Sequence, residues 1–188
     1  MERTRRQRSA DTRARILAAA KRLFSEDGYD RTTIRAVAAE ATIDPSMVMR
    51  YFRSKKGLFT AAARFDLGLP DLSHLPRRKL GEAMVDYFLK RWEGELNGKD
   101  LQILLRSAAT LDSAAKRMYD IFQHQLVPFI RQYCGTQRAE ECAALVATQM
   151  LGLGYIRYVL KFSEVTNLSH AVIRRRIGAT IQAYLDMR

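Results

Sequence analysis

The chain has 188 residues, of which 47% are hydrophobic, so it can form one or two domains with cores of their own. Its net charge of +12 and sequence pI of about 10.1 indicate an acidic partner such as nucleic acid or an anionic membrane surface. The two cysteines fit neither a zinc site nor a redox motif nor a disulfide framework. No signal peptide is predicted, because no apolar run follows the N-terminal arginines, and we expect a cytoplasmic protein.

Residues 1–9 contain four arginines and no apolar residue after Met1. This composition predicts a basic arm that is disordered in the free protein. The same arm would reach DNA phosphates or the minor groove in a complex. A first long helix is predicted from Asp11 or Thr12 to Gly28, since glycine is typical just past a helix end.

Residues 32–56 predict two short helices joined by a tight turn, followed by the start of a third. Thr32 or Thr33 is placed to cap the first helix, and Asp44 followed by Pro45 is a helix start. The apolar face of the second helix is formed by Val48, Tyr51 and Phe52. Its other face points outwards and consists of Pro45, Ser46, Met47, Met49 and Arg50. This pattern is typical of a helix-turn-helix, whose second helix enters the DNA major groove.

The next helix begins with a predicted cap at Ser54, and Lys55 and Lys56 fall in its first turn. Cations are disfavoured at the positive end of the helix dipole. Either the two lysines are solvated, or a DNA phosphate binds at this helix N-terminus; the neighbouring helix-turn-helix favours the phosphate. This helix is predicted to extend to about Leu67, and residues 68–76, with two prolines and a glycine, form a break.

Every predicted segment after the break is helical, so the fold class is all-α with about nine helices. The predicted domains are residues 1–67, a three-helix DNA-binding domain, and residues 68–188, a helical effector-binding and dimerisation domain. A kink is expected at Pro128, inside the helix that runs from about residue 112 to residue 133.

The last two helices, at about 138–162 and 169–185, are too apolar to be covered by a small domain alone. We expect them to pack against the same helices of a second chain as a four-helix interface. The residues expected there are Val146, Leu153, Ile173, Ile177, Ile181 and Tyr184. The first of these helices contains an arginine and two glycines, which favours a buried soluble helix over a membrane span.

A ligand pocket is expected among the middle helices, where apolar bulk is combined with polar tips. Plain core packing is the alternative for each candidate. The candidates are Tyr87, Trp92, Arg106, Phe122, Met150, Tyr155 and Tyr158. Three interpretations stay open for Arg157: pairing with a carboxylate, contact with an acidic ligand, or exposure to solvent. There is no phosphate-binding loop, nucleophile elbow or metal-ligand cluster, so we expect no enzyme, no metal and no cofactor.

Residues 12–67 resemble the DNA-binding domain of the tetracycline-repressor (TetR) family of bacterial regulators. The resemblance rests on three segments: LFSEDGY at the end of the first helix, TTIRAVAAEATI, and YFRSKKGLF. The last segment holds the family pattern of an aromatic pair, a lysine and a leucine-aromatic pair, here Tyr51, Phe52, Lys55, Leu58 and Phe59. The C-terminal region is similar more loosely, in helix order and in its LLRSAAT and MLGLGYIRYVL segments.

The resemblance implies a homodimer that binds a palindromic double-stranded DNA operator and usually represses transcription. It also implies release by a small molecule bound in the C-terminal domain, of unknown identity. By position, Thr33 and Arg35 would approach DNA backbone or base edges, and Tyr51 and Lys55 would each bind a phosphate. The groove-facing residues would be Pro45, Ser46, Met47, Met49 and Arg50. A sequence-nonspecific, nucleoid-type DNA-binding protein is the alternative that the charge favours.

Two departures from the family pattern have physical consequences. Thr42 stands in the turn where the family often has glycine, and a positive φ there would strain a β-branched residue by about 1 kcal/mol or more. Met47 and Met49 offer apolar contacts but no strong hydrogen bonds. Arg50 is therefore the main candidate for reading a base edge, with a bidentate contact to guanine worth roughly 1–3 kcal/mol.

Overall fold

The computed structural model describes residues 2–63, 66–94 and 98–187, and these ranges contain helices and no strands. The chain divides into two compact units: unit 1 is Met1–Phe65 with Lys99–Ala115, and unit 2 is Asp66–Gly98 with Lys116–Arg188. The predicted all-α class with an N-terminal helix-turn-helix is confirmed. Residues 99–115 were expected in the second domain, but they pack with the N-terminal helices.

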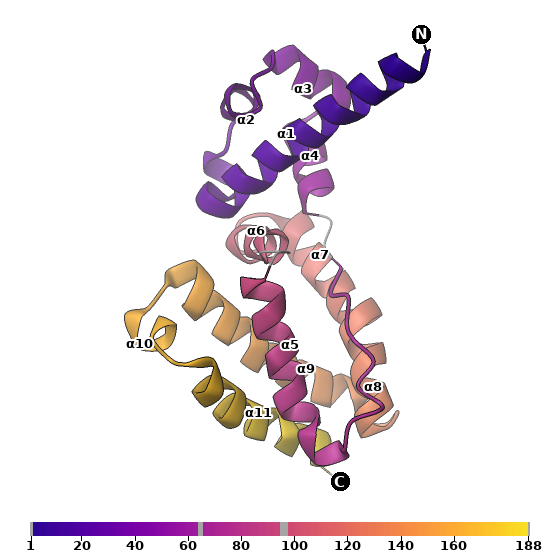
Figure 1. Cartoon of the computed structure of the whole chain (residues 1–188), viewed down its shortest axis with the longest axis vertical. Helices are drawn as coiled ribbons and strands as arrows, with labels where there is room; N and C mark the ends of the chain where they lie inside the picture. Colours follow the sequence, from indigo (N-terminus) through magenta and orange to yellow (C-terminus); the bar gives the residue numbers. More distant parts are fainter. Residues whose placement is uncertain (1, 64–65, 95–97, 188) are drawn as a thin grey trace. The chain divides into compact units, whose positions relative to one another are not determined.

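Unit 1 is organised around its first helix. Its elements are α1 (Glu2–Arg31), α2 (Ile34–Glu40), α3 (Pro45–Phe52), α4 (Lys55–Ala62), α6 (Lys99–Ser107) and the start of α7 (Asp112–Ile121) (Figure 1). The α1 stripe Ile16, Ala20 and Phe24 is fully buried. Phe24 meets Phe59 of α4 edge to face, with ring centroids 5.3 Å apart. Because α6 also packs on α1, unit 1 has a larger core than residues 1–67 alone would provide.

Helix α1 differs from the prediction at its N-terminal end. Residues 2–9 continue the helix, where a disordered arm was expected. Arginine and glutamine are good helix formers, and extending an existing helix requires no new nucleus. At the other end, the predicted break at Gly28 is confirmed, since its φ of 77° and ψ of −179° interrupt the helix. Helix α4 ends at Ala62, and Phe65, predicted within it, lies outside the described residues.

Unit 2 contains the remaining elements. They are η1 (Arg77–Lys79), α5 (Leu80–Glu93), the rest of α7, η2 (Phe122–Leu126), α8 (Val127–Cys134), α9 (Ala139–Gly154), η3 (Tyr155–Leu160), α10 (Ser163–Thr166) and α11 (His170–Asp186). The irregularity expected at Pro128 takes the form of η2, a π-helical segment directly before α8. Proline has no N–H for the carbonyl group four residues earlier, that of His124, and the helix is widened at that residue.

The last helix, α11, packs mainly on α5 (Figure 1). The two backbones approach closely at Gly81 and Gly178, where a Cβ atom on Gly81 would lie 2.2 Å from the carbonyl oxygen of Gly178. This contact uses the apolar stripe that the sequence analysis assigned to a second chain. Four residues predicted at the dimer interface are buried inside unit 2: Ile173 and Ile181 of α11, and Val146 and Leu153 of α9. The sequence analysis did not consider that α5 of the same chain could cover the apolar stripe of α11.

Candidate nucleic-acid interface

The turn between α2 and α3 is built from local hydrogen bonds. Thr33 caps α2, its hydroxyl oxygen accepting from the backbone N–H of Ala36 at 3.0 Å. The helix ends with the N–H groups of Thr42 and Ile43 donating to carbonyl groups of α2, and Thr42 takes a φ of 54°. The strained conformation that the sequence analysis considered for Thr42 is therefore present.

A side chain from α1 holds this turn in place. The guanidinium of Arg15 donates to the carbonyl oxygen of Ala41 at 2.5 Å and to that of Thr42 at 3.2 Å. These carbonyl groups lie at the C-terminal end of α2, where a cation is favourable. The sequence analysis missed Arg15, because no local pattern distinguishes it from the other arginines of α1.

The recognition helix α3 begins as predicted. The carboxylate of Asp44 accepts from the N–H of Ser46 at 2.7 Å, and the hydrogen bonds from Ser46 lower the pKa of Asp44. Val48 and Phe52 are buried beneath the helix, which fixes its orientation on unit 1. The opposite face is open, and Met49 is exposed. Arg50 is exposed as well, and its guanidinium carbon lies 5.6 Å from the ring centroid of Tyr51.

The predicted phosphate ligand Lys55 has a partner within unit 1. Its ammonium group donates to the carbonyl oxygen of Asp30 at 3.1 Å and lies 4.4 Å from the ring centroid of Tyr29. Ser54 caps α4, accepting from the N–H of Gly57 at 2.9 Å. Lys55 thus ties the start of α4 to the end of α1, whereas Lys56 is exposed at the same helix N-terminus.

Tyr51 also contacts α1. Its hydroxyl lies 3.0 Å from the hydroxyl of Ser9, and this hydrogen bond is the main reason that the pKa of Tyr51 is lowered. The helical N-terminal segment of α1 therefore lies beside the phosphate-binding position that the family resemblance implies for Tyr51. Nothing in the sequence near Ser9 indicated this pairing.

The nine predicted DNA-binding residues all belong to α2, α3 and α4 or cap them. The exposed ones are Thr33, Arg35, Pro45, Ser46, Met49 and Arg50, and the half-buried ones are Met47, Tyr51 and Lys55. Exposed positions on consecutive elements of one helix-turn-helix form a surface that a duplex can reach.

The seven predicted ligand-binding residues belong to several elements of both units. Trp92 and Tyr158 stack at 4.6 Å between ring centroids, and Tyr155 is exposed. Tyr87 is engaged elsewhere, with its hydroxyl 2.5 Å from the carbonyl oxygen of Leu67. Phe122 and Met150 pack against the core of unit 2, whereas Arg106 lies in α6 of unit 1. Core packing, the alternative considered in the sequence analysis, describes several of these side chains.

Arg157 is buried, and its environment distinguishes between the three interpretations. Its guanidinium pairs with the carboxylate of Glu93 at 3.1 Å and donates to the carbonyl oxygen of Val165 at 2.6 Å. Tyr158 and His170 also contact that carboxylate, at 2.6 and 2.7 Å. Burial alone would raise the pKa of Glu93, but these hydrogen bonds and the nearby charges outweigh it and lower the pKa. Arg157 thus pairs with a carboxylate of the same chain.

Comparisons with known proteins agree with this geometry. A family described as "Tetracyclin repressor-like, C-terminal domain" matches residues 79–185, and "Bacterial regulatory proteins, tetR family" matches residues 16–62. The HTH-type transcriptional repressor Rv1474c of Mycobacterium tuberculosis is 39% identical over 57 residues, which are 30% of this chain and 30% of that protein.

Two solved structures share the fold over nearly the whole chain. NalD of Pseudomonas aeruginosa, the secondary repressor of the MexAB-OprM multidrug efflux pump, superimposes with a TM-score of 0.68 at 20% identity, covering 95% of this chain and 97% of NalD. A transcriptional regulator from Saccharomonospora viridis in complex with choline gives a TM-score of 0.67 at 22% identity, covering 92% and 96%.

The fold and the exposed recognition helix define a helix-turn-helix DNA-binding protein with a helical C-terminal domain. The chain belongs to the TetR family of bacterial transcriptional regulators, because the two family matches together span both of its parts. Proteins of this family bind DNA and ligands and are generally not enzymes.

Proposed function

We propose that this protein is a cytoplasmic transcriptional repressor that binds a palindromic operator as a homodimer. The observation that carries the proposal is the open face of α3, anchored from below by Val48 and Phe52 and presenting Arg50 to solvent. A helix fixed by its buried side can place a guanidinium at a defined base pair. The net charge of +12 adds the nonspecific attraction to phosphates that such binding needs.

We infer that the backbone contacts come from the flanks of α3. Thr33 and Arg35 are exposed at the start of α2, and Tyr51 is half-buried near the end of α3. Lys56 is the freer of the two lysines at the start of α4, because Lys55 already bonds to Asp30. In this arrangement Lys55 contributes to phosphate binding in two ways. It holds the N-terminus of α4 in place, where free N–H groups can bind a phosphate, and it adds its own positive charge.

The homodimer is supported by the apolar surface that α9 leaves open. Residues 139–160 are long and apolar enough to cross a membrane by length and composition, and only 33% of their most apolar 18-residue window is buried. The apolar face that remains open includes Leu145 and Leu151 of α9, which are half-buried, and Tyr155 of η3, which is exposed. With α11, where Ile177 and Tyr184 remain half-buried, this face suits an isologous contact with a second copy.

Release of DNA by a small molecule is the remaining part of the proposal. Unit 2 is larger than DNA binding requires, and the Saccharomonospora viridis regulator of the same fold was solved with choline. A ligand that binds better to a conformation with misplaced recognition helices would shift the population away from DNA binding.

The decisive experiment measures fluorescence anisotropy with the DNA that flanks the protein's own gene, at about 150 mM salt and with random DNA as competitor. We expect tight binding to one palindromic fragment. Equal, salt-sensitive binding to every fragment would contradict sequence-specific repression and favour the nucleoid-type alternative.

Arg50→Ala should reduce the preference for that fragment by roughly 1–3 kcal/mol while affinity for random DNA changes little, because a base contact is lost. Arg31→Ala, which removes an exposed arginine at the far end of α1, is the matched control and should retain the preference. Circular dichroism checks that both variants fold. A folded Arg50→Ala protein with unchanged preference would exclude Arg50 as the base-reading residue.

A further inference from the structure

The end of the recognition helix α3 rests against the N-terminal part of α1 (Figure 1). The hydroxyl oxygens of Ser9 and Tyr51 are 3.0 Å apart, and the guanidinium carbon of Arg13 lies 5.3 Å from the ring centroid of Phe52. Ser9 and Arg13 are four residues apart in sequence, so they lie on one face of α1. The match to the tetR DNA-binding family begins at residue 16, so both residues of α1 lie outside it.

Tyr51 lies on the flank of α3 and not on its open face. It follows Arg50 directly, so it is turned from the open face by about 100°. An α-helix with its side chains is about 10–12 Å across, and the DNA major groove is about 12 Å wide. A side chain on the flank of a helix in that groove therefore meets the groove wall, which is the sugar-phosphate backbone.

The two hydroxyls can form a chain of hydrogen bonds that ends on a phosphate. A phosphate oxygen accepts, and each hydroxyl has one proton to donate. If Tyr51 donates to phosphate, its oxygen is free to accept from Ser9 at the observed 3.0 Å. The hydroxyl of Thr12, nearly one turn further along α1, already donates to the carbonyl oxygen of Arg8 at 2.8 Å. Ser9 is therefore the residue that supplies the proton to Tyr51.

The surroundings of this hydroxyl pair are basic. Residues 8–15 and 50–53 together contain five arginines and one carboxylate, that of Asp11. Asp11 is two residues from Ser9, about 200° around the helix, so it lies on the other side of α1. The hydrogen bond with Ser9 and the charge of Arg50 lower the pKa of Tyr51, and a more acidic phenol is a stronger hydrogen-bond donor.

We propose that Ser9 and Tyr51 form a binding site for one backbone phosphate of the operator, with Ser9 as the positioning residue. Ser9 donates to the hydroxyl oxygen of Tyr51, and Tyr51 donates to a phosphate oxygen. The inference rests on the proposed function in one respect, that α3 lies in the major groove. It adds the N-terminal part of α1 to the DNA interface as a helical support for the recognition helix.

The test measures fluorescence anisotropy of the full-length protein with operator and random DNA, at about 50 mM salt, where nonspecific binding is also strong. Tyr51→Phe should weaken binding to both DNAs about a hundredfold, or tenfold for each protomer, because a charge-assisted hydrogen bond is lost. Ser9→Ala should weaken both about tenfold, because the tyrosine hydroxyl is no longer held. The operator preference and the salt dependence should not change, because phosphate contacts carry no sequence information and neither hydroxyl is a cation.

Three further variants separate positioning from a structural effect. Ser9→Thr keeps a hydroxyl and should restore binding to within about twofold of the wild type. Ser9→Ala in the Tyr51→Phe background should cause no further loss, because Ser9 acts only through the tyrosine hydroxyl. Ser163→Ala, which removes an exposed serine hydroxyl from α10 of unit 2, is the matched control and should change nothing. Urea unfolding should show nearly wild-type stability throughout, because the hydrogen bond between Ser9 and Tyr51 is exposed.

Unchanged DNA affinity in Ser9→Ala would overturn the inference. Tighter binding would overturn it as well, because it would mean that Ser9 withholds the tyrosine hydroxyl from DNA. An equal loss from Ser9→Ala with and without that hydroxyl would overturn the positioning role, since Ser9 would then bind DNA on its own.

The same measurements distinguish this inference from the proposed function. If the wild type prefers no fragment but Ser9→Ala and Tyr51→Phe weaken binding to all of them as expected, sequence-specific repression fails and the phosphate site stands. If the operator is preferred and Ser9→Ala has no effect, the repressor stands and the phosphate site fails.

Discussion

At the scale of single residues, the turn of the helix-turn-helix combines strain with compensation. Thr42 occupies the left-handed region, which costs a β-branched residue about 1 kcal/mol or more, yet it sits where glycine would be unstrained. The hydrogen bonds from Arg15 to Ala41 and Thr42 stabilise the same turn. The α2–α3 geometry is thus set partly by a side chain from α1.

Thr42→Gly should stabilise the folded protein by about 1 kcal/mol, because the strain at φ 54° disappears while the side chain that is removed is exposed. Urea denaturation monitored by circular dichroism measures the change. Ala41→Gly is the matched control: Ala41 has a φ of −78°, so glycine there should destabilise by roughly 0.5–1 kcal/mol. A loss of stability in Thr42→Gly would mean that the threonine side chain has a stabilising role.

At the scale of elements, the sequence predicted the helices well because their signals are local. The cap at Asp44, the break at Gly28 and the irregularity near Pro128 each depend on residues within a few positions. The partners of these helices could not be predicted in the same way. Whether the stripe of α11 covers α5 or a second chain depends on a close approach between Gly81 and Gly178, which periodicity does not reveal.

The candidate DNA site likewise has features that follow from local sequence and others that depend on contacts between distant residues. Its open face follows from the helical period of α3: Pro45, Ser46, Met49 and Arg50 are exposed, and Met47 is half-buried. The roles of Ser9, Arg15 and Lys55 arise from contacts across 42, 26 and 25 residues of sequence. A pattern in a single sequence does not reveal contacts between residues that are so far apart along the chain.

The Glu93–Arg157 pair is the main polar link between α5, η3 and α10. Arg157→Met should destabilise unit 2 by about 3 kcal/mol, because it leaves a partly buried carboxylate without its guanidinium. Glu93→Gln alone should also destabilise, and the double variant should lose less than the sum of the two. Thermal unfolding measures all three. Strict additivity would show that the two side chains contribute independently.

At the scale of the whole molecule, the chain passes between the two units more than once. Residues 99–115 leave unit 2 after α5 and join unit 1 before the chain returns within α7. A change in unit 2 therefore has routes to the DNA-binding unit through α6 as well as through the end of α4. Helix α4 therefore leads to only one of the places where the chain passes from one unit to the other.

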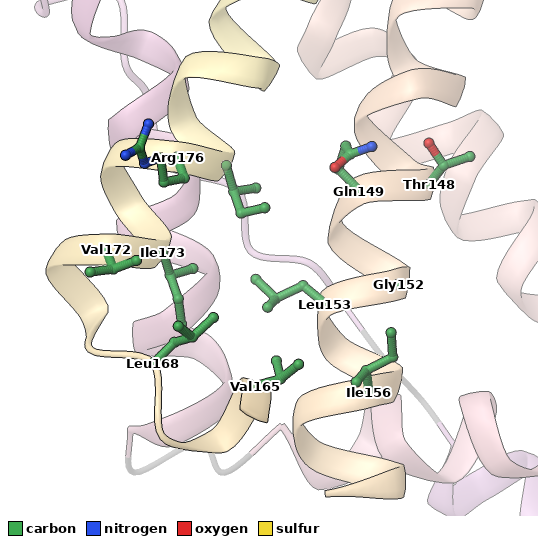
Figure 2. Close-up of a pocket in the computed structure, with 11 residues that line it drawn as sticks. Thr148, Gln149, Gly152, Leu153, Ile156, Val165, Leu168, Val172, Ile173 and Arg176 are labelled. Atoms are coloured by element: carbon green, nitrogen blue, oxygen red, sulfur yellow. The ribbon is translucent and has the colours of Figure 1, made fainter. Parts of the chain in front are cut away.

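The proposed dimer gives the last prediction. Leu151 is half-buried on α9 and is not among the residues that line the hollow between α9, α10 and α11 (Figure 2), so a charge there disturbs an apolar contact through α9 without filling that hollow. Leu151→Glu should yield monomers in sedimentation velocity, because two carboxylates would face an apolar isologous contact. Operator affinity should fall by about a hundredfold or more, since each monomer reads only one half-site.

Ala171→Glu is the control, because it adds the same charge at an exposed position in the first turn of α11, where an anion is favourable. It should remain dimeric and bind the operator normally. If Leu151→Glu also remained dimeric, the interface would have to lie away from the outward face of α9. If it became monomeric but kept full operator affinity, the palindrome and the two-fold dimer would no longer explain DNA binding.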